Sequence, residues 1–101
     1  MLNQAVMVGR LVNDIEIKEM EDGKKITSIT LAIPRSYKNA DGEYDTDFVT
    51  CNLWNNLAEQ TVNYCKKGDL VGVKGRLQTE DDKLIVIAEK ITFLSSKKEE
   101  E

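Results

Sequence analysis

Hydrophobic and polar residues alternate along much of this chain, and the alternation predicts short β-strands. The clearest case is DFVTCNLWNN, residues 47–56. At a period of two, one face of this segment is apolar and suits a core: Val49, Cys51 and Leu53. The other face places two large aromatics among polar residues: Phe48, Thr50, Asn52 and Trp54. Because Phe, Trp and Tyr make up only 6% of the chain, two rings on the polar side of a strand require an explanation.

Four further segments have strand-like patterns. With the first one included, the predicted strands cover residues 2–12, 25–38, 46–54, 70–79 and 84–94. Pro34 should end the regular part of the second strand, because proline cannot donate to a sheet ladder. Turn signals separate the strands: Asp22-Gly23, a polar hairpin loop at 39–46 that contains Asp41-Gly42, and EDDK at 80–83.

Between the third and fourth strands the hydrophobic period changes and predicts a short helix. The residues that recur at the spacing of one helix face are Leu57, Ala58, Thr61, Val62 and Cys65. Asn55 or Asn56 would cap the start of this helix. Lys66, Lys67 and Gly68 would supply a basic last turn and a glycine stop.

The order of these elements predicts the fold class. Three strands, one helix and two strands fit into about 100 residues, which is too short for two cores. Five short strands bent at glycines, with one helix between the third and fourth, suit the oligonucleotide/oligosaccharide-binding (OB) barrel. We therefore predict an all-β, five-stranded OB-fold barrel at residues 1–95 and a short charged C-terminal tail at 96–101.

Some strand segments are apolar on both faces, which predicts an interface between copies. They are AVMV in the first strand, LVGV in the fourth and LIVIA in the fifth. A small barrel has a single interior, so a strand that is apolar on both faces must also bury its outer face. A symmetric homo-oligomer is the expected solution in a single-domain chain.

Composition and residue types exclude several classes of function. The chain has no histidine, so neither a Ser–His nor a Cys–His catalytic pair can form. Cys51 and Cys65 do not have the spacing of a metal-binding pair, and we expect two buried free thiols. The acidic clusters DGEYDTD and EDD fall in predicted turns and lack a calcium-loop pattern. We expect no enzymatic activity, no metal and no cofactor.

The location and surface charge of the protein can be judged from the same composition. No run of 18 apolar residues and no signal-type segment is present, which favours the cytoplasm over membrane insertion or secretion. The net charge is −4, from 14 basic and 18 acidic residues. A surface that binds nucleic acid must be locally basic, so any such groove has to be confined to one part of the molecule.

The aromatic face offers the strongest candidate chemistry. Phe48, Trp54 and Tyr37 would lie on or beside the second and third strands. The cations that could border the same groove are Arg35, Lys38, Arg10, Lys18 and Arg76. Flat rings flanked by cations suit an unpaired nucleic-acid strand, because bases stack on the rings at about 1–3 kcal/mol each and the cations follow the phosphates. The alternative is that the 37–46 loop or a subunit interface covers the rings. We interpret Tyr44 and Tyr64 as packing residues.

Four segments together resemble the bacterial single-stranded DNA-binding protein family. They are LNQAVMVGRL, ITLAI, DFVTCNLWNNLAE and KKGDLVGVKGRLQT, and the resemblance covers about residues 2–95. It is closest to forms from low-GC Gram-positive bacteria and their phages or mobile elements. It implies an OB fold, usually a homotetramer, that coats single-stranded DNA with little sequence preference. The residues that it places in DNA contact are Tyr37, Phe48 and Trp54 as stacking rings, Arg10, Lys18, Arg35 and Arg76 near phosphates, and Lys66 and Lys67 at the periphery.

Departures from the family pattern are also visible. The loop between the fourth and fifth strands, which often contributes another aromatic, is reduced to EDDK, and Asn55 and Asn56 stand where basic residues are common. Both changes predict weaker binding. The end SSKKEEE has acidic residues but not the usual linker and hydrophobic tip that recruit replication and repair enzymes. The remaining alternatives are a dimeric primosome-type OB protein for replication restart, an OB module for protein assembly, and an RNA chaperone.

Overall fold

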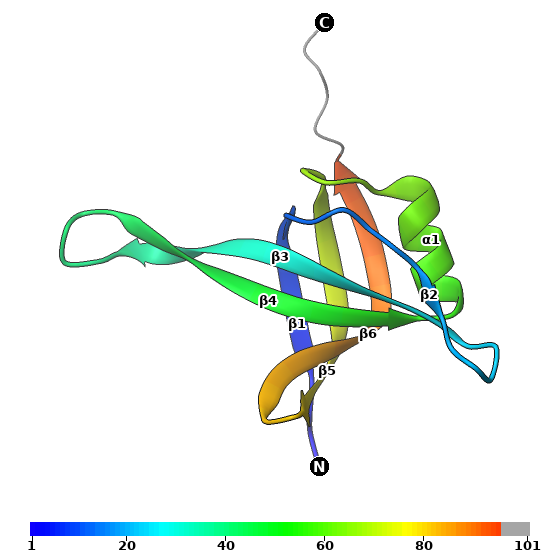
Figure 1. Cartoon of the computed structure of the whole chain (residues 1–101). Coiled ribbons are helices and arrows are strands. Elements are labelled where there is room, and N and C mark those ends of the chain that lie inside the picture. The colour runs from blue at the N-terminus through cyan, green and yellow to red at the C-terminus, as the bar shows by residue number, and fades with distance from the viewer. Residues whose placement is uncertain (96–101) are drawn as a thin grey trace, which may run out of the picture.

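The computed structural model describes residues 1–95 and contains six strands and one helix in that range (Figure 1). In chain order these are β1 (Ala5–Leu11), β2 (Lys18–Glu19), β3 (Lys25–Lys38), β4 (Tyr44–Trp54), α1 (Asn56–Tyr64), β5 (Leu70–Glu80) and β6 (Lys83–Ser95). The five predicted strands correspond to β1, β3, β4, β5 and β6. The two-residue strand β2 is an addition at the edge of β3. The predicted tail at 96–101 lies outside the described residues.

The five long strands close into a barrel. Their hydrogen-bonded order is β1–β5–β6–β4–β3, and β3 returns to β1 through Arg10↔Ala32 and Leu11↔Leu31. β4 and β6 meet in parallel through Cys51↔Val86 and Asn52↔Ile87, whereas the other neighbouring strands are antiparallel. The predicted five-stranded OB barrel, with its helix between the third and fourth long strands, is confirmed.

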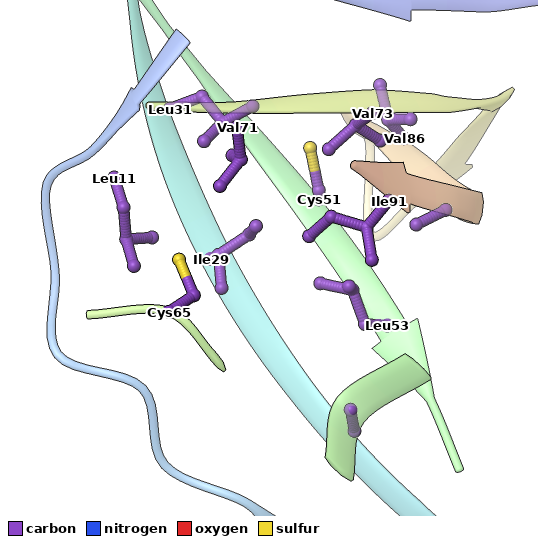
Figure 2. Packing of buried hydrophobic residues seen from close by; sticks show 12 residues of the cluster. Leu11, Ile29, Leu31, Cys51, Leu53, Cys65, Val71, Val73, Val86 and Ile91 are labelled. Atoms are coloured by element: carbon purple, nitrogen blue, oxygen red, sulfur yellow. The ribbon is translucent and has the colours of Figure 1, made fainter. Parts of the chain in front are cut away.

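Apolar side chains from all five barrel strands meet in the interior, as Figure 2 shows. On β4, Cys51 and Leu53 are fully buried and Val49 packs against the same cluster, so the predicted core face is confirmed. Cys51 and Cys65 are both buried and free. Burial raises the pKa of the Cys51 thiol to about 12 and that of the Cys65 thiol to about 11, so neither is ionised near neutral pH.

The helix α1 has the predicted buried face only in part. Ala58 and Thr61 are buried, but Val62 is exposed, and Cys65 lies just beyond the end of the helix. No side-chain cap forms at the start, so that prediction is wrong. The side-chain oxygen of Asn55 instead accepts a hydrogen bond of 3.0 Å from the backbone N–H of Lys25. This bond links the start of α1 to β3. The pair Lys66-Lys67 follows the helix and does not form its last turn.

The β3–β4 hairpin extends well beyond the barrel as a two-stranded projection (Figure 1), which we call the arm (residues 34–47). The regular pairing of β3 with β4 ends at Pro34, as predicted, and an irregularity separates it from the last pair, Lys38↔Tyr44. The predicted loop at 39–46 is wrong in its extent, since β4 begins at Tyr44. Asn39 makes this tight tip possible. Its side-chain oxygen accepts the backbone N–H groups of Asp41 and Glu43, at 2.8 and 3.0 Å.

The strands that are apolar on both faces divide into two cases. On β1, Val6 is 72% exposed and Val8 is also exposed, so an open apolar strip exists there as predicted. With Gly72, Thr92 and Leu94, and with the two lysines Lys74 and Lys90, they line one hollow on the outer face of β1, β5 and β6. On β6, in contrast, Ile85, Val86, Ile87 and Ala88 are all buried within the single chain. The prediction that this segment needs a second copy to cover it is therefore wrong.

Candidate nucleic-acid interface

A first row of side chains crosses the outer face of β2, β3 and β4. Residues that stand directly opposite each other in a ladder lie on the same face of the sheet. Lys18 on β2 pairs with Ile26 on β3, and Ile26 pairs with Trp54 on β4. A cation, an aliphatic side chain and a ring therefore follow one another across three strands. Trp54 is half-buried in this row.

A second row repeats the arrangement about 20 Å further along β4, because six residues separate the two rings at about 3.3 Å each. Arg10 on β1 pairs with Ala32 on β3, which pairs with Phe48 on β4. Phe48 is 65% exposed, so its ring is an open platform. Neighbouring strands lie about 4.8 Å apart, which puts the backbone of Arg10 about 10 Å from that of Phe48.

Polar side chains occupy the face between the two rings. Ser28 donates a hydrogen bond of 2.6 Å to the side-chain oxygen of Asn52, and Thr30 stands opposite Thr50. The pairing continues from Asn52 to Ile87 on β6 and from there to Arg76 on β5. Arg76 therefore lies on the same outer face, where its guanidinium is 3.5 Å from Glu89.

Two surface hollows lie at the cationic ends of the rows. One, of about 550 Å³, is lined by Lys18 and Ile26 together with the acidic residues Asp14 and Glu16. The other, of about 400 Å³, is lined by Arg10 and Ala32 and reaches Pro34 and Thr46 at the base of the arm. The face is therefore hollowed beside both rows, and only the second hollow is free of carboxylates among the residues that line it.

One side of the arm has its charge compensated within the chain. Arg35 donates to both carboxylate oxygens of Asp47, at 2.9 and 3.1 Å, and lies 3.8 Å from Asp45. Hydrogen bonding to Asp47 raises the pKa of Arg35, and the same bond lowers the pKa of Asp47. Tyr37, an exposed residue two positions after Arg35, also raises the pKa of Arg35 by a charge interaction.

The other side of the arm continues the face of Phe48. Tyr44 is an even number of residues from Phe48 on β4 and therefore points to the same side. Its ring is 56% exposed, and the Nζ atom of Lys38 lies 5.9 Å from the ring centroid. Our interpretation of Tyr44 as a packing residue is therefore wrong. Tyr64 on α1 does contact another ring, that of Phe93 at 5.9 Å, although it is exposed as well.

The predicted site residues thus fall into two groups. One outer face holds the larger group: Phe48, Trp54, Arg10, Lys18, Arg76 and, on the arm, Lys38. Arg35 lies on the opposite side of the arm, where it meets Asp47, and Tyr37 lies in the irregular segment between Pro34 and Lys38. The sequence could have placed Tyr44 on the same face as Phe48, because an even number of residues separates them in a strand. The predicted loop at 39–46 hid this relation, since it left Tyr44 outside the strand. Within residues 1–95, no group of three or more His, Cys, Asp or Glu side chains could hold a metal ion, and no helix is long and apolar enough to cross a membrane.

Comparison with known proteins identifies the family. The model of the "Single-strand binding protein family" matches residues 2–84, which include all of β1 to β5. The chain belongs to the single-strand binding protein family. Its resemblance to forms from low-GC Gram-positive bacteria is confirmed by its relatives. It is 49% identical over 79 residues to Single-stranded DNA-binding protein B of Bacillus subtilis (strain 168), an alignment that covers 78% of this chain and 70% of the relative.

Two other members of the single-strand binding protein family align over more of the chain. Single-stranded DNA-binding protein 3 of Listeria innocua is 41% identical over 106 residues, covering 96% of this chain and 66% of the relative. Single-stranded DNA-binding protein of Bacillus cereus is 40% identical over 103 residues, covering 93% and 61%. The chain thus spans 61–70% of the length of these three relatives.

Proposed function

We propose that this chain binds single-stranded DNA with little sequence preference and coats it during replication, recombination or repair. The observation that supports this most directly is the repeated row on the outer face, in which a cation and a ring flank an aliphatic side chain. The names of the relatives point to the same ligand.

In this proposal, the rings bind bases and the cations bind the backbone. Bases stack on the exposed face of Phe48 and on the accessible part of Trp54, which any base can do. Arg10, Lys18 and Arg76 border the rings and face the phosphates. The hydroxyl groups of Ser28, Thr30 and Thr50 line the path of the strand from one ring to the other, a distance of about six base steps at the B-form rise of 3.4 Å.

Tyr37 and Arg35 remain predicted DNA contacts with an additional geometric requirement. Because Arg35 lies on the opposite side of the arm from Phe48, a strand reaches Arg35 only by passing around the arm. Arg35 would also have to exchange its ion pair with Asp47 for a phosphate. Substituting Tyr37 alone would test this path separately from the main face.

The proposal includes the setting in which the protein works. The chain acts without catalysis, in the cytoplasm and associated with the nucleoid, as a homo-oligomer that is usually a tetramer in this family. The exposed strip of Val6 and Val8 supports an interface between copies. A dimer would favour the primosome-type alternative, and the absence of any nucleic-acid binding would favour an OB module for protein assembly.

The test is a titration that follows Trp54 fluorescence with oligo(dT), duplex DNA and RNA of equal length. We expect single-stranded DNA to bind much more tightly than duplex DNA. If Arg10, Lys18, Arg76 and Lys38 each neutralise one phosphate, the log–log slope of affinity against salt should be about −2 to −3. A slope near zero, or equal affinity for duplex DNA, contradicts the proposal. Preferential binding of RNA indicates the RNA-chaperone alternative.

A further inference from the structure

Tyr44 and Lys38 form a ring–cation pair on the arm, and the proposed function uses only Lys38 of this pair, as a cation that neutralises a phosphate. We propose that this pair is a further stacking site for single-stranded DNA, which extends the path of the strand beyond Phe48 and onto the arm. This inference rests on the proposed function and names a part of the ligand path that lies outside the barrel.

Strand geometry puts the pair in line with Phe48. The ladder between β3 and β4 pairs Pro34 with Thr46 and then Lys38 with Tyr44. The irregularity adds two residues to β3 only, and an even number preserves the alternation of side-chain direction. Tyr44, Lys38 and Phe48 therefore share one side of the hairpin, and the two rings are about 13 Å apart along β4.

The charges on the arm distinguish its two sides. Lys38 has no carboxylate within ion-pair distance among the described residues, whereas Arg35 on the opposite side is held by Asp47 and Asp45. A base that stacks on Tyr44 would bring its phosphate close to the ammonium group of Lys38. The side with the unpaired cation and the exposed ring is thus the one that suits a polyanion with aromatic bases.

The tip of the arm fixes both the orientation and the limit of this site. Asn39 donates to the carboxylate of Asp45 at 3.0 Å and accepts two backbone N–H groups, which holds the chain on both sides of the turn. Tyr44 therefore stands on ordered backbone. Asp41 and Glu43 lie at the turn immediately beyond it, so phosphates are repelled there and the path should end at Tyr44.

The experiment compares variants over a series of strand lengths, from (dT)4 to about (dT)16, the range of site sizes known for single OB folds. Trp54 fluorescence remains available as the signal in every variant. For strands long enough to reach the arm, Tyr44→Ala should lower the affinity about 5- to 150-fold. Tyr44→Phe should bind like the wild type, because it keeps the ring. The matched control is Tyr64→Ala, which removes an exposed tyrosine on α1 and should change nothing.

The length dependence identifies the cause of any effect. Tyr44→Ala should leave the shortest strands unaffected, since these can occupy Phe48 or Trp54 without reaching the arm. Wild-type affinity in Tyr44→Ala at every length overturns the inference while leaving the proposed function intact. A change in mass of Tyr44→Ala by light scattering, with normal DNA affinity, also overturns it, because the arm would then be a protein contact. If wild-type protein binds no strand at all, the proposed function itself fails.

Discussion

Phe48 and Leu53 stand on the same strand, face opposite sides, and should respond in opposite ways to truncation. Leu53 is fully buried, so Leu53→Ala leaves a cavity and should cost about 2–5 kcal/mol of the free energy of unfolding. Phe48 is 65% exposed and buries only about a third of its surface. Because full burial of a phenylalanine contributes about 1.5–3 kcal/mol, Phe48→Ala should cost only about 0.5–1 kcal/mol.

The effects on DNA binding should be reversed. Phe48→Ala removes a stacking platform worth about 1–3 kcal/mol, which corresponds to about a 5- to 150-fold loss of affinity. Leu53 contributes nothing to the outer face. The DNA affinity of Leu53→Ala, measured well below its melting temperature, should therefore stay within about threefold of the wild type. Trp54→Ala should lie between the two, because the half-buried ring serves both purposes.

Two measurements on the same samples decide the outcome. Thermal unfolding without DNA should lower the melting temperature of Leu53→Ala by at least about 8 °C, and that of Phe48→Ala by only a few degrees, given about 4–8 °C per kcal/mol for a domain of this size. Anisotropy with a labelled oligo(dT) then gives the affinity. If Phe48→Ala melts as early as Leu53→Ala and binds DNA normally, the ring belongs to a protein interface, and the assignment of the stacking face is refuted.

Two further predictions concern packing and assembly. A methyl group added at Gly75 would collide with the backbone carbonyl of Ile87, so Gly75→Ala should lower stability by about 1–3 kcal/mol or more. Thermal unfolding of Gly75→Ala at the wild-type temperature would contradict the close approach of β5 and β6. Light scattering should report about four chains, and Val8→Asp should reduce that mass because it places a charge in the exposed strip of β1; a monomeric wild type would show that the strip is not an interface.

Most of the fold follows from local pattern in the sequence. The period-two alternation from Val49 to Leu53 assigns the core side of β4 correctly, because a strand with one buried face leaves little freedom in its pattern. The change of period after Trp54 correctly located the helix. The misassigned Val62 shows the limit of this reasoning, since a short helix against a barrel buries a narrower face than the apolar residues suggest.

The arm could not be derived in the same way. At its tip the side chain of Asn39 accepts two backbone N–H groups in addition to the backbone hydrogen bonds of the turn, and nothing in the hydrophobic pattern reports such bonds. The pairing of Arg35 with Asp47 depends on the register of β3 against β4, in which Asp47 stands opposite Ile33, and sequence spacing does not provide that register. The sequence pattern likewise does not show that Ile85 and Ile87 are buried within the single chain.

The barrel is closed by two short junctions, Arg10↔Ala32 with Leu11↔Leu31, and Cys51↔Val86 with Asn52↔Ile87. The long hairpins β3–β4 and β5–β6 can form locally, but these junctions join residues far apart in sequence and carry the larger loop-closure entropy. A ligand that contacts Arg10, Phe48 and Arg76 together spans both junctions and can bind only while they are closed. Its binding free energy then adds to that of folding, so a bound strand would stabilise the two junctions that have the fewest paired residues.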